Sequence, residues 1–109
     1  MTEKEVHVYR NEDIKRIIAF IPRGHLHVRV LIETSDKIMV FQEATIAGVI
    51  RAYINVAMHP YRKAVELKSI RLSKNSRKLG FAEHQLIETN RLDNDILDEV
   101  ENIIDTSNR

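Results

Sequence analysis

The sequence predicts an α+β domain, and three observations carry that prediction. Residues 25–34 and 37–43 alternate in side-chain character, as half-buried strands do. Residues 46–57 and 96–104 repeat apolar side chains at helical spacing. The composition is that of a folded protein, because 43% of the 109 residues are hydrophobic and 30% are charged. We therefore expect one α+β domain that spans residues 1–109.

The N-terminal part predicts a strand followed by a helix. Residues 5–10 alternate, with two valines on one side and His7 and Tyr9 on the other. Asn11 is a favourable N-cap residue, and isoleucines follow at positions i, i+3, i+4 and i+7 of residues 14–21. Pro22 is expected to end this helix.

The middle of the chain predicts a hairpin and a second helix. Strands at residues 25–34 and 37–43 are separated by Thr34-Ser35-Asp36-Lys37, which has the composition of a turn. The helix that follows carries a broad apolar stripe made of Ile46, Val49, Ile50, Tyr53, Ile54 and Ala57. Pro60 closes it.

Residues 63–88 permit two interpretations. Residues 64–72 contain good helix formers and could continue as a helix. We favour a hairpin with its turn near residues 74–76 and a second strand around residues 81–87. A last helix is predicted after Asp93 or Asn94, with a stripe of Ile96, Val100, Ile103 and Ile104.

The first six predicted elements follow the order βαββαβ, which is the pattern of ferredoxin-like domains. We therefore expect a ferredoxin-like core, with an antiparallel sheet and both helices on one face. A possible fifth strand and a C-terminal helix would extend it. This expectation concerns architecture alone, since many functions use this fold.

Several classes of protein are disfavoured by what the sequence lacks. There is no cysteine, which excludes disulfide scaffolds and thiolate metal sites. The three glycines form no nucleotide-binding motif. The longest apolar run, residues 17–21, is too short to span a membrane, and the N-terminus lacks the pattern of a signal peptide. We expect a cytoplasmic protein with no membrane contact and no cofactor.

Charge is spread unevenly along a chain whose formal net charge is only +1. Residues 59–84, the basic segment, carry seven Lys or Arg against two Glu, and residues 85–109 carry seven Asp or Glu against two Arg. The two segments could neutralise each other within one chain. Alternatively, the basic segment binds a polyanion.

The expected open face of the sheet combines imidazole, aromatic and guanidinium groups, from His7, Tyr9, His25, His27, Arg29, Met39 and Phe41. One interpretation is that another copy of the protein or the C-terminal helix covers this face. We favour a homo-oligomer, and among homo-oligomers we favour a dimer. The other is that single-stranded nucleic acid stacks on it. The candidate nucleic-acid contacts are Tyr9, Arg29, Phe41, Arg62, Lys63, Lys68, Arg71, Lys74, Arg77 and Lys78.

A third interpretation comes from Gly24-His25-Leu26-His27-Val28. Two histidines two positions apart on a strand project from the same face and can share one divalent metal. This stretch resembles the His-hydrophobic-His motif of the HUH endonucleases, in which a tyrosine on a later helix attacks single-stranded DNA. The resemblance implies His25 and His27 as metal ligands and Tyr53 as nucleophile, with Tyr61 as the reserve. It covers about five residues, and the chain lacks the polar residues that usually follow the tyrosine.

The sequence thus leaves three functional hypotheses. The favoured one is a small self-associating interaction module that also binds nucleic acid. The alternatives are an HUH-type nuclease and a purely structural subunit.

Overall fold

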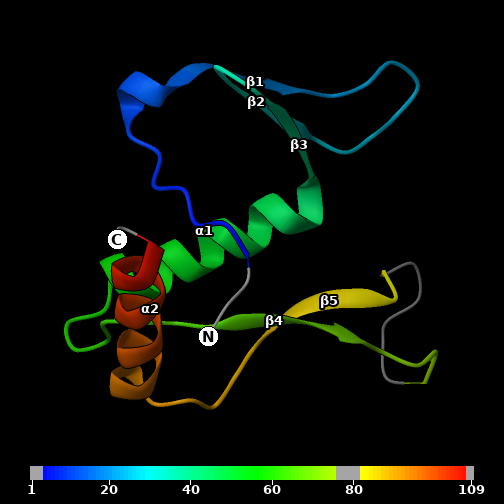
Figure 1. Ribbon diagram of the computed structural model, residues 1–109. Coiled ribbons are helices and arrows are strands. Elements are labelled where there is room, and N and C mark those ends of the chain that lie inside the picture. Colours follow the sequence, from blue (N-terminus) through cyan, green and yellow to red (C-terminus); the bar gives the residue numbers. More distant parts are fainter. Residues whose placement is uncertain (1–3, 76–81, 108–109) are drawn as a thin grey trace.

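The computed structural model of the protein describes residues 4–75 and 82–107. These described residues form five strands and two helices, so the predicted α+β class is confirmed. In chain order the elements are a 3-10 turn (Asn11–Asp13), β1 (Ile14–Phe20), β2 (Arg29–Thr34), β3 (Ile38–Gln42), α1 (Glu43–Ala57), β4 (Leu67–Arg71), β5 (His84–Glu88) and α2 (Asp93–Ser107) (Figure 1). The described strands form two separate antiparallel sheets, which we call the upper sheet (β1-β2-β3) and the lower hairpin (β4-β5).

The N-terminal part differs from both expectations. Residues 5–10 belong to no strand. The Asn11 cap signal produces only one 3-10 turn, in which the Asp13 carboxylate accepts the backbone N–H of Arg10 at 2.9 Å.

The helix expected at residues 14–21 is instead strand β1. The isoleucines that suggested a helical stripe are β-branched, and such residues favour strands when a partner strand supplies the hydrogen bonds. Here β2 is that partner, with Ile17 opposite Ile32 and Ile18 opposite Leu31. Their helical spacing also fits a strand with apolar residues on both faces.

The upper sheet contains the predicted hairpin. β2 is its central strand and pairs with β3 through a two-residue turn. The backbone N–H of Thr34 donates to the Lys37 carbonyl at 2.9 Å, and the buried Thr34 hydroxyl accepts the N–H of Lys37 at 3.2 Å. β2 begins at residue 29 rather than 25, because residues 22–25 form a turn with Gly24 at φ +81°. Its closing bond runs from the His25 N–H to the Pro22 carbonyl at 3.0 Å.

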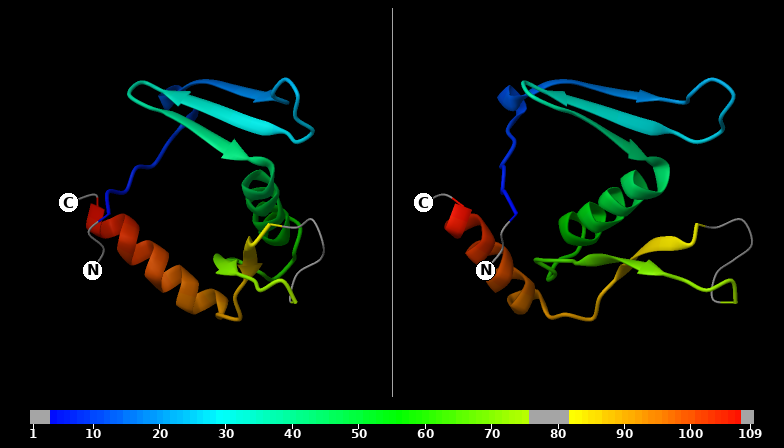
Figure 2. Two further views of the ribbon diagram at one scale, coloured as in Figure 1. Left: turned by 90° about the vertical axis from the view of Figure 1, so that its right-hand side faces the viewer. Right: turned by 45° about the vertical axis from the view of Figure 1, so that its right-hand side comes forward.

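The second half of the chain follows the sequence prediction closely. α1 covers the expected helix and begins three residues earlier. The lower hairpin confirms the preferred interpretation of residues 63–88, so a continued helix at residues 64–72 is wrong. α2 is also confirmed. α1 lies between the upper sheet and the lower hairpin, and the N-terminal segment runs from the upper sheet down toward α2 (Figures 1 and 2).

The expected single ferredoxin-like sheet is not formed. Such a sheet needs a strand followed by a crossover helix before the first hairpin. Residues 5–21 instead form a 3-10 turn followed by strand β1. β4 pairs with β5 and joins no strand of the upper sheet. Within the described ranges, no helix has the length and apolar character needed to cross a bilayer.

Candidate self-association surface

Helix α1 has two different faces, and one of them packs against the lower hairpin. This packed face contains Gly48, which is buried. A Cβ atom at Gly48 would lie 2.6 Å from Leu86 Cδ1, so any larger residue there would require the end of the Leu86 side chain to shift. Arg51 reinforces the contact, since its Nη2 donates to the Leu86 carbonyl at 2.7 Å.

The other face of α1 is the apolar stripe predicted from the sequence, and most of it is exposed. We call this the α1 stripe, made of Val49, Ile50, Tyr53 and Ile54. Val49 is 64% exposed and Tyr53 is 71% exposed. A helix with apolar or small residues on most of its circumference is normally buried on all sides. The α1 stripe therefore lacks the cover that its composition requires.

Both faces of the upper sheet are apolar as well. Paired residues share a face, so the register places Ile17, Ile32 and Met39 on one face. The same register places Ile18, Leu31 and Val40 on the opposite face. Ile17 and Val40 are both more exposed than buried. Sheets that are apolar on both faces normally lie between two covering layers.

The whole chain exposes far more surface than a compact monomer. Its accessible surface is 9415 Å², whereas a compact monomer of 12.7 kDa exposes about 6,200 Å². The radius of gyration is 16.4 Å, against about 13 Å for a compact domain of this length.

The buried apolar side chains of the described residues are few and lie in the lower half. They are Ala64 and Ile96, next to the start of β4 and in the first turns of α2. No apolar side chain of the upper sheet reaches comparable burial. The upper sheet and the α1 stripe together therefore form an extensive uncovered apolar surface, which we take as the candidate functional site.

His25 and His27 lie in the loop before β2, and not on a strand as expected. The Nδ1 atom of His27 lies 3.2 Å from Glu43 Oε1, and the backbone N–H of Val28 donates to Glu43 Oε2 at 2.7 Å. These contacts join the loop to the first turn of α1. The Val28 hydrogen bond, followed by the contact with His27, lowers the pKa of Glu43. Among the described residues, no group of three His, Asp or Glu side chains is placed to hold a metal ion.

The candidate nucleophiles are not gathered around the two histidines. Tyr53 lies ten residues into α1, about 15 Å along the helix axis from Glu43. It belongs to the exposed α1 stripe. Tyr61 is also exposed, beyond the end of α1, and its ring meets His59 edge to face with centroids 6.2 Å apart.

The expected aromatic and imidazole face is not assembled. Tyr9 lies in the segment before the 3-10 turn, where its ring stacks on His7 with centroids 6.1 Å apart. Phe41 is opposite Val30, and Arg29 is opposite Gln42. Phe41 and Arg29 therefore project from opposite faces of the upper sheet.

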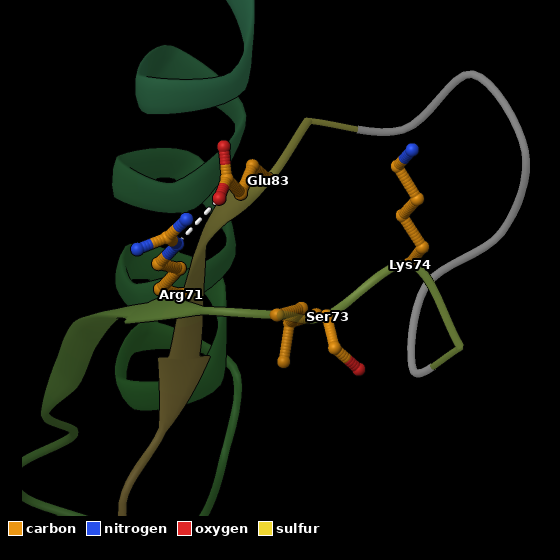
Figure 3. Close-up of a pocket in the computed structure, with 5 residues that line it drawn as sticks. Arg71, Ser73, Lys74 and Glu83 are labelled. Atoms are coloured by element: carbon orange, nitrogen blue, oxygen red, sulfur yellow. Dashed lines mark hydrogen bonds and ion pairs between the residues drawn. The ribbon is translucent and has the colours of Figure 1, made fainter.

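Two of the candidate nucleic-acid-binding cations of the basic segment form ion pairs within the chain. Arg62 pairs with Glu88 at 2.9 Å, and Arg71 pairs with Glu83 (Figure 3). Lys63, Lys68 and Lys74 are exposed. Arg71, Lys74 and Glu83 line a shallow pocket of about 470 Å³, completed by Leu72 and Ser73. Arg77 and Lys78 lie outside the described residues. Of these two ion pairs, Arg62 with Glu88 joins the basic segment to residues 85–109, whereas Arg71 and Glu83 both belong to the basic segment.

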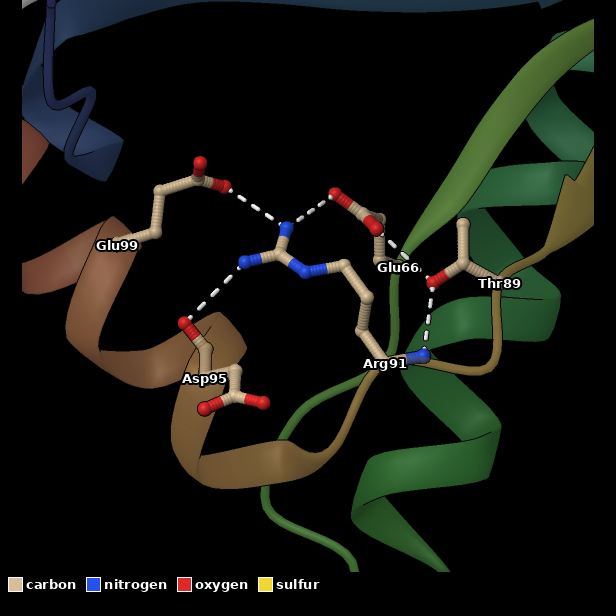
Figure 4. Close-up of polar contacts among 5 residues, drawn as sticks. All are labelled: Glu66, Thr89, Arg91, Asp95 and Glu99. Carbon is tan, nitrogen blue, oxygen red and sulfur yellow. Dashed lines mark hydrogen bonds and ion pairs between the residues drawn. The ribbon is translucent and has the colours of Figure 1, made fainter.

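A polar network attaches α2 to the lower hairpin. The Nη1 atom of Arg91 donates to Glu66 Oε2 at 2.9 Å and to Glu99 Oε1 at 3.0 Å (Figure 4). The Thr89 hydroxyl donates to Glu66 Oε1 at 2.9 Å. The hydrogen bond from Thr89 and the charge of Arg91 lower the pKa of Glu66. Asp93 accepts the backbone N–H of Lys63 at 2.6 Å, which lowers the pKa of Asp93.

Comparisons with known proteins identify no relative. No protein-family model, no curated protein and no solved structure matches this chain.

The sequence interpretation missed the two-sided character of the upper sheet, although a signal was present. Val30, Leu31 and Ile32 are three consecutive apolar residues in the clearest strand, and residues 17–21 form another apolar run. Continuous apolar runs are typical of strands that are covered on both faces. A strictly alternating interpretation of residues 25–34 therefore missed that β2 has apolar residues on both faces.

Proposed function

We propose that the protein is a self-associating interaction module whose folded unit is a homodimer. The observation that carries the proposal is its exposed surface, about 3,000 Å² beyond that of a compact monomer of this mass. Large apolar side chains of α1 and the upper sheet are among the exposed residues. The second copy would cover the α1 stripe.

The size of the excess favours a second copy over a small ligand. Permanent homodimers bury roughly 1,000–2,500 Å² on each partner, with a strongly apolar interface. The uncovered surface is sufficient for such an interface. A small-molecule site, by contrast, is a concave pocket that occupies a limited part of the surface. The pocket beside Arg71 is shallow and partly polar, and it lies away from the α1 stripe.

The proposal is tested by sedimentation equilibrium together with thermal unfolding at several protein concentrations. We expect the mass of a dimer and an unfolding midpoint that rises with concentration, because association stabilises only the folded chain. A monomer mass, with a midpoint independent of concentration, would overturn the proposal.

A matched pair of variants locates the surface. Tyr53→Lys puts a charge into the α1 stripe, and Ala44→Lys puts the same charge on an exposed position of α1 one turn before Gly48, away from the stripe. We expect Tyr53→Lys to weaken dimerisation at least tenfold, or to unfold the chain if the monomer is not stable. Ala44→Lys should remain a dimer with nearly normal stability. Equal effects of the two variants would exclude the α1 stripe as the interface.

Nucleic-acid binding remains a second proposal for the basic segment, supported by the exposed side chains of Lys63, Lys68 and Lys74. Binding of single-stranded oligonucleotides that weakens steeply with rising salt would support it. Absence of binding at about 50 mM salt would overturn it and leave self-association unaffected. The nuclease alternative receives no support from the separated positions of Tyr53 and His27, and we derive no reaction from it.

A further inference from the structure

The two outer edges of the upper sheet differ in how they are protected. β1 forms one edge and carries Lys15 and Arg16. Its pairing with β2 also contains a register shift between Ile14 and Arg16. Charged side chains and irregularities of this kind are the usual means by which an edge strand avoids pairing with other chains. The β1 edge is therefore protected against further strand addition.

The β3 edge has none of these features. Its five residues, Ile38 to Gln42, include no charge and no proline, and its pairing with β2 is regular. Ile38 is 59% exposed and Val40 is 52% exposed. An uncharged, regular and exposed edge strand is a template on which another strand can pair.

The backbone of β3 is correctly oriented to accept such a strand. The hydrogen bond from the Thr34 N–H to the Lys37 carbonyl makes these two residues a hydrogen-bonded pair. Hydrogen-bonded and non-bonded pairs alternate along an antiparallel ladder. Met39 and Phe41 therefore direct their backbone groups toward β2, whereas Ile38, Val40 and Gln42 direct theirs toward the open edge.

We propose that β3 of one copy pairs antiparallel with β3 of a second copy, with the two-fold axis at Val40. This inference rests on the proposed homodimer and specifies one contact between its two chains. The two upper sheets would become one six-stranded sheet, in which Val40 exchanges both backbone hydrogen bonds with the partner's Val40. Two-fold symmetry is the usual arrangement of homodimers, and it makes this interface self-complementary.

The side chains fit this register. Met39 lies opposite the partner's Phe41, a favourable pairing of a thioether with an aromatic ring. Ile38 lies opposite the partner's Gln42. Just beyond the strand ends, the same register brings Lys37 opposite the partner's Glu43. The charges nearest to the ladder are therefore opposite in sign. No like charges face each other along the ladder.

Single-cysteine cross-linking tests the register directly, because the chain contains no cysteine of its own. In a hydrogen-bonded antiparallel pair the two Cα atoms are about 5.5 Å apart, which suits a disulfide. We expect Val40→Cys to form a covalent dimer under mild oxidation. Ile17→Cys, at a similarly exposed position on the β1 edge, is the matched control and should stay non-covalent.

A second cross-link keeps the test decisive if Val40→Cys folds poorly. Ile38→Cys and Gln42→Cys chains should each fail to cross-link alone and should form a disulfide when mixed. A dimer mass for the unmodified protein without any of these cross-links would overturn the β3 pairing and leave the homodimer intact. Equally efficient cross-linking of Ile17→Cys would also overturn the pairing. A monomer mass would overturn both proposals.

Discussion

The upper sheet and the lower half of the molecule are stabilised in different ways. The lower half has the buried side chains Ala64 and Ile96 and a network of ion pairs centred on Arg91. The upper sheet has three paired strands but leaves apolar side chains uncovered on both faces. Backbone hydrogen bonds alone contribute little net stability in water, whereas covering apolar surface contributes most of it. The lower half therefore depends on contacts within one chain, whereas the upper sheet and the α1 stripe would depend on the proposed second copy.

The largest effect should come from the lower half. Ile96 is 7% exposed, and Ile96→Ala removes buried methyl groups and leaves a cavity. We expect a loss of about 2–4 kcal/mol in the free energy of unfolding, measured by denaturant titration. Because Ile96 is covered within its own chain, the dimer dissociation constant should change little. An unchanged free energy of unfolding, or an effect mainly on the dimer dissociation constant, would contradict this division of the molecule.

An intermediate effect should come from the α1 stripe. In one chain Val49 is 64% exposed, and replacing an exposed helical valine by alanine should stabilise the helix by about 0.5 kcal/mol. If a second copy covers Val49, Val49→Ala instead removes interface area. We expect the dimer dissociation constant to rise about tenfold, which corresponds to about 1.4 kcal/mol, in sedimentation experiments. A gain in stability with unchanged association would show that Val49 faces solvent.

The smallest effect should be on the acid sensitivity of the lower half. Hydrogen bonds and nearby cations lower the pKa of Glu66 and Asp93 below their usual values. Such groups stabilise the folded state fully at a pH above about 4, and this contribution is lost as the pH falls through their folded pKa values. Glu66→Gln should lower the unfolding midpoint at pH 7 and flatten its decline toward pH 2.

Glu101→Gln is the control for the acid experiment, because Glu101 is an exposed acid of α2 outside the network in Figure 4. It should leave both the midpoint and its pH profile nearly unchanged. Hydrogen exchange would sharpen the comparison further, since α2 amides should lose protection in acid before those of β2. Equal loss of protection in α2 and β2 would contradict it.

The elements that the sequence predicted correctly are those with a strong local signal. A turn sequence lies at residues 34–37, Pro60 follows the end of α1, and Asp93 begins α2. Residues 14–20 were assigned to a helix wrongly because their isoleucine spacing fits two structures. Only pairing with β2, whose residues lie about 15 positions along the chain, favours the strand.

The candidate site was predictable in its chemistry and not in its position. The sequence indicated an apolar stripe on α1 and a surface that another copy would cover. It placed that surface on an aromatic and histidine-rich sheet face, whereas the register of β2 with β3 puts Arg29 and Phe41 on opposite faces. A shift of one residue in assumed alternation moves every side chain to the other face. Local patterns cannot exclude such a shift.

By itself, the sequence determined that this protein is α+β and where most of its turns and helices lie. These properties depend on neighbouring residues, whose effects on backbone conformation are local. The tertiary structure decided which surface stays uncovered. Gly48 allows Leu86 to approach one face of α1, and this contact leaves Val49 and Tyr53 on the opposite face. Because that choice depends on contacts between residues far apart in the chain, no single segment of the sequence specifies it.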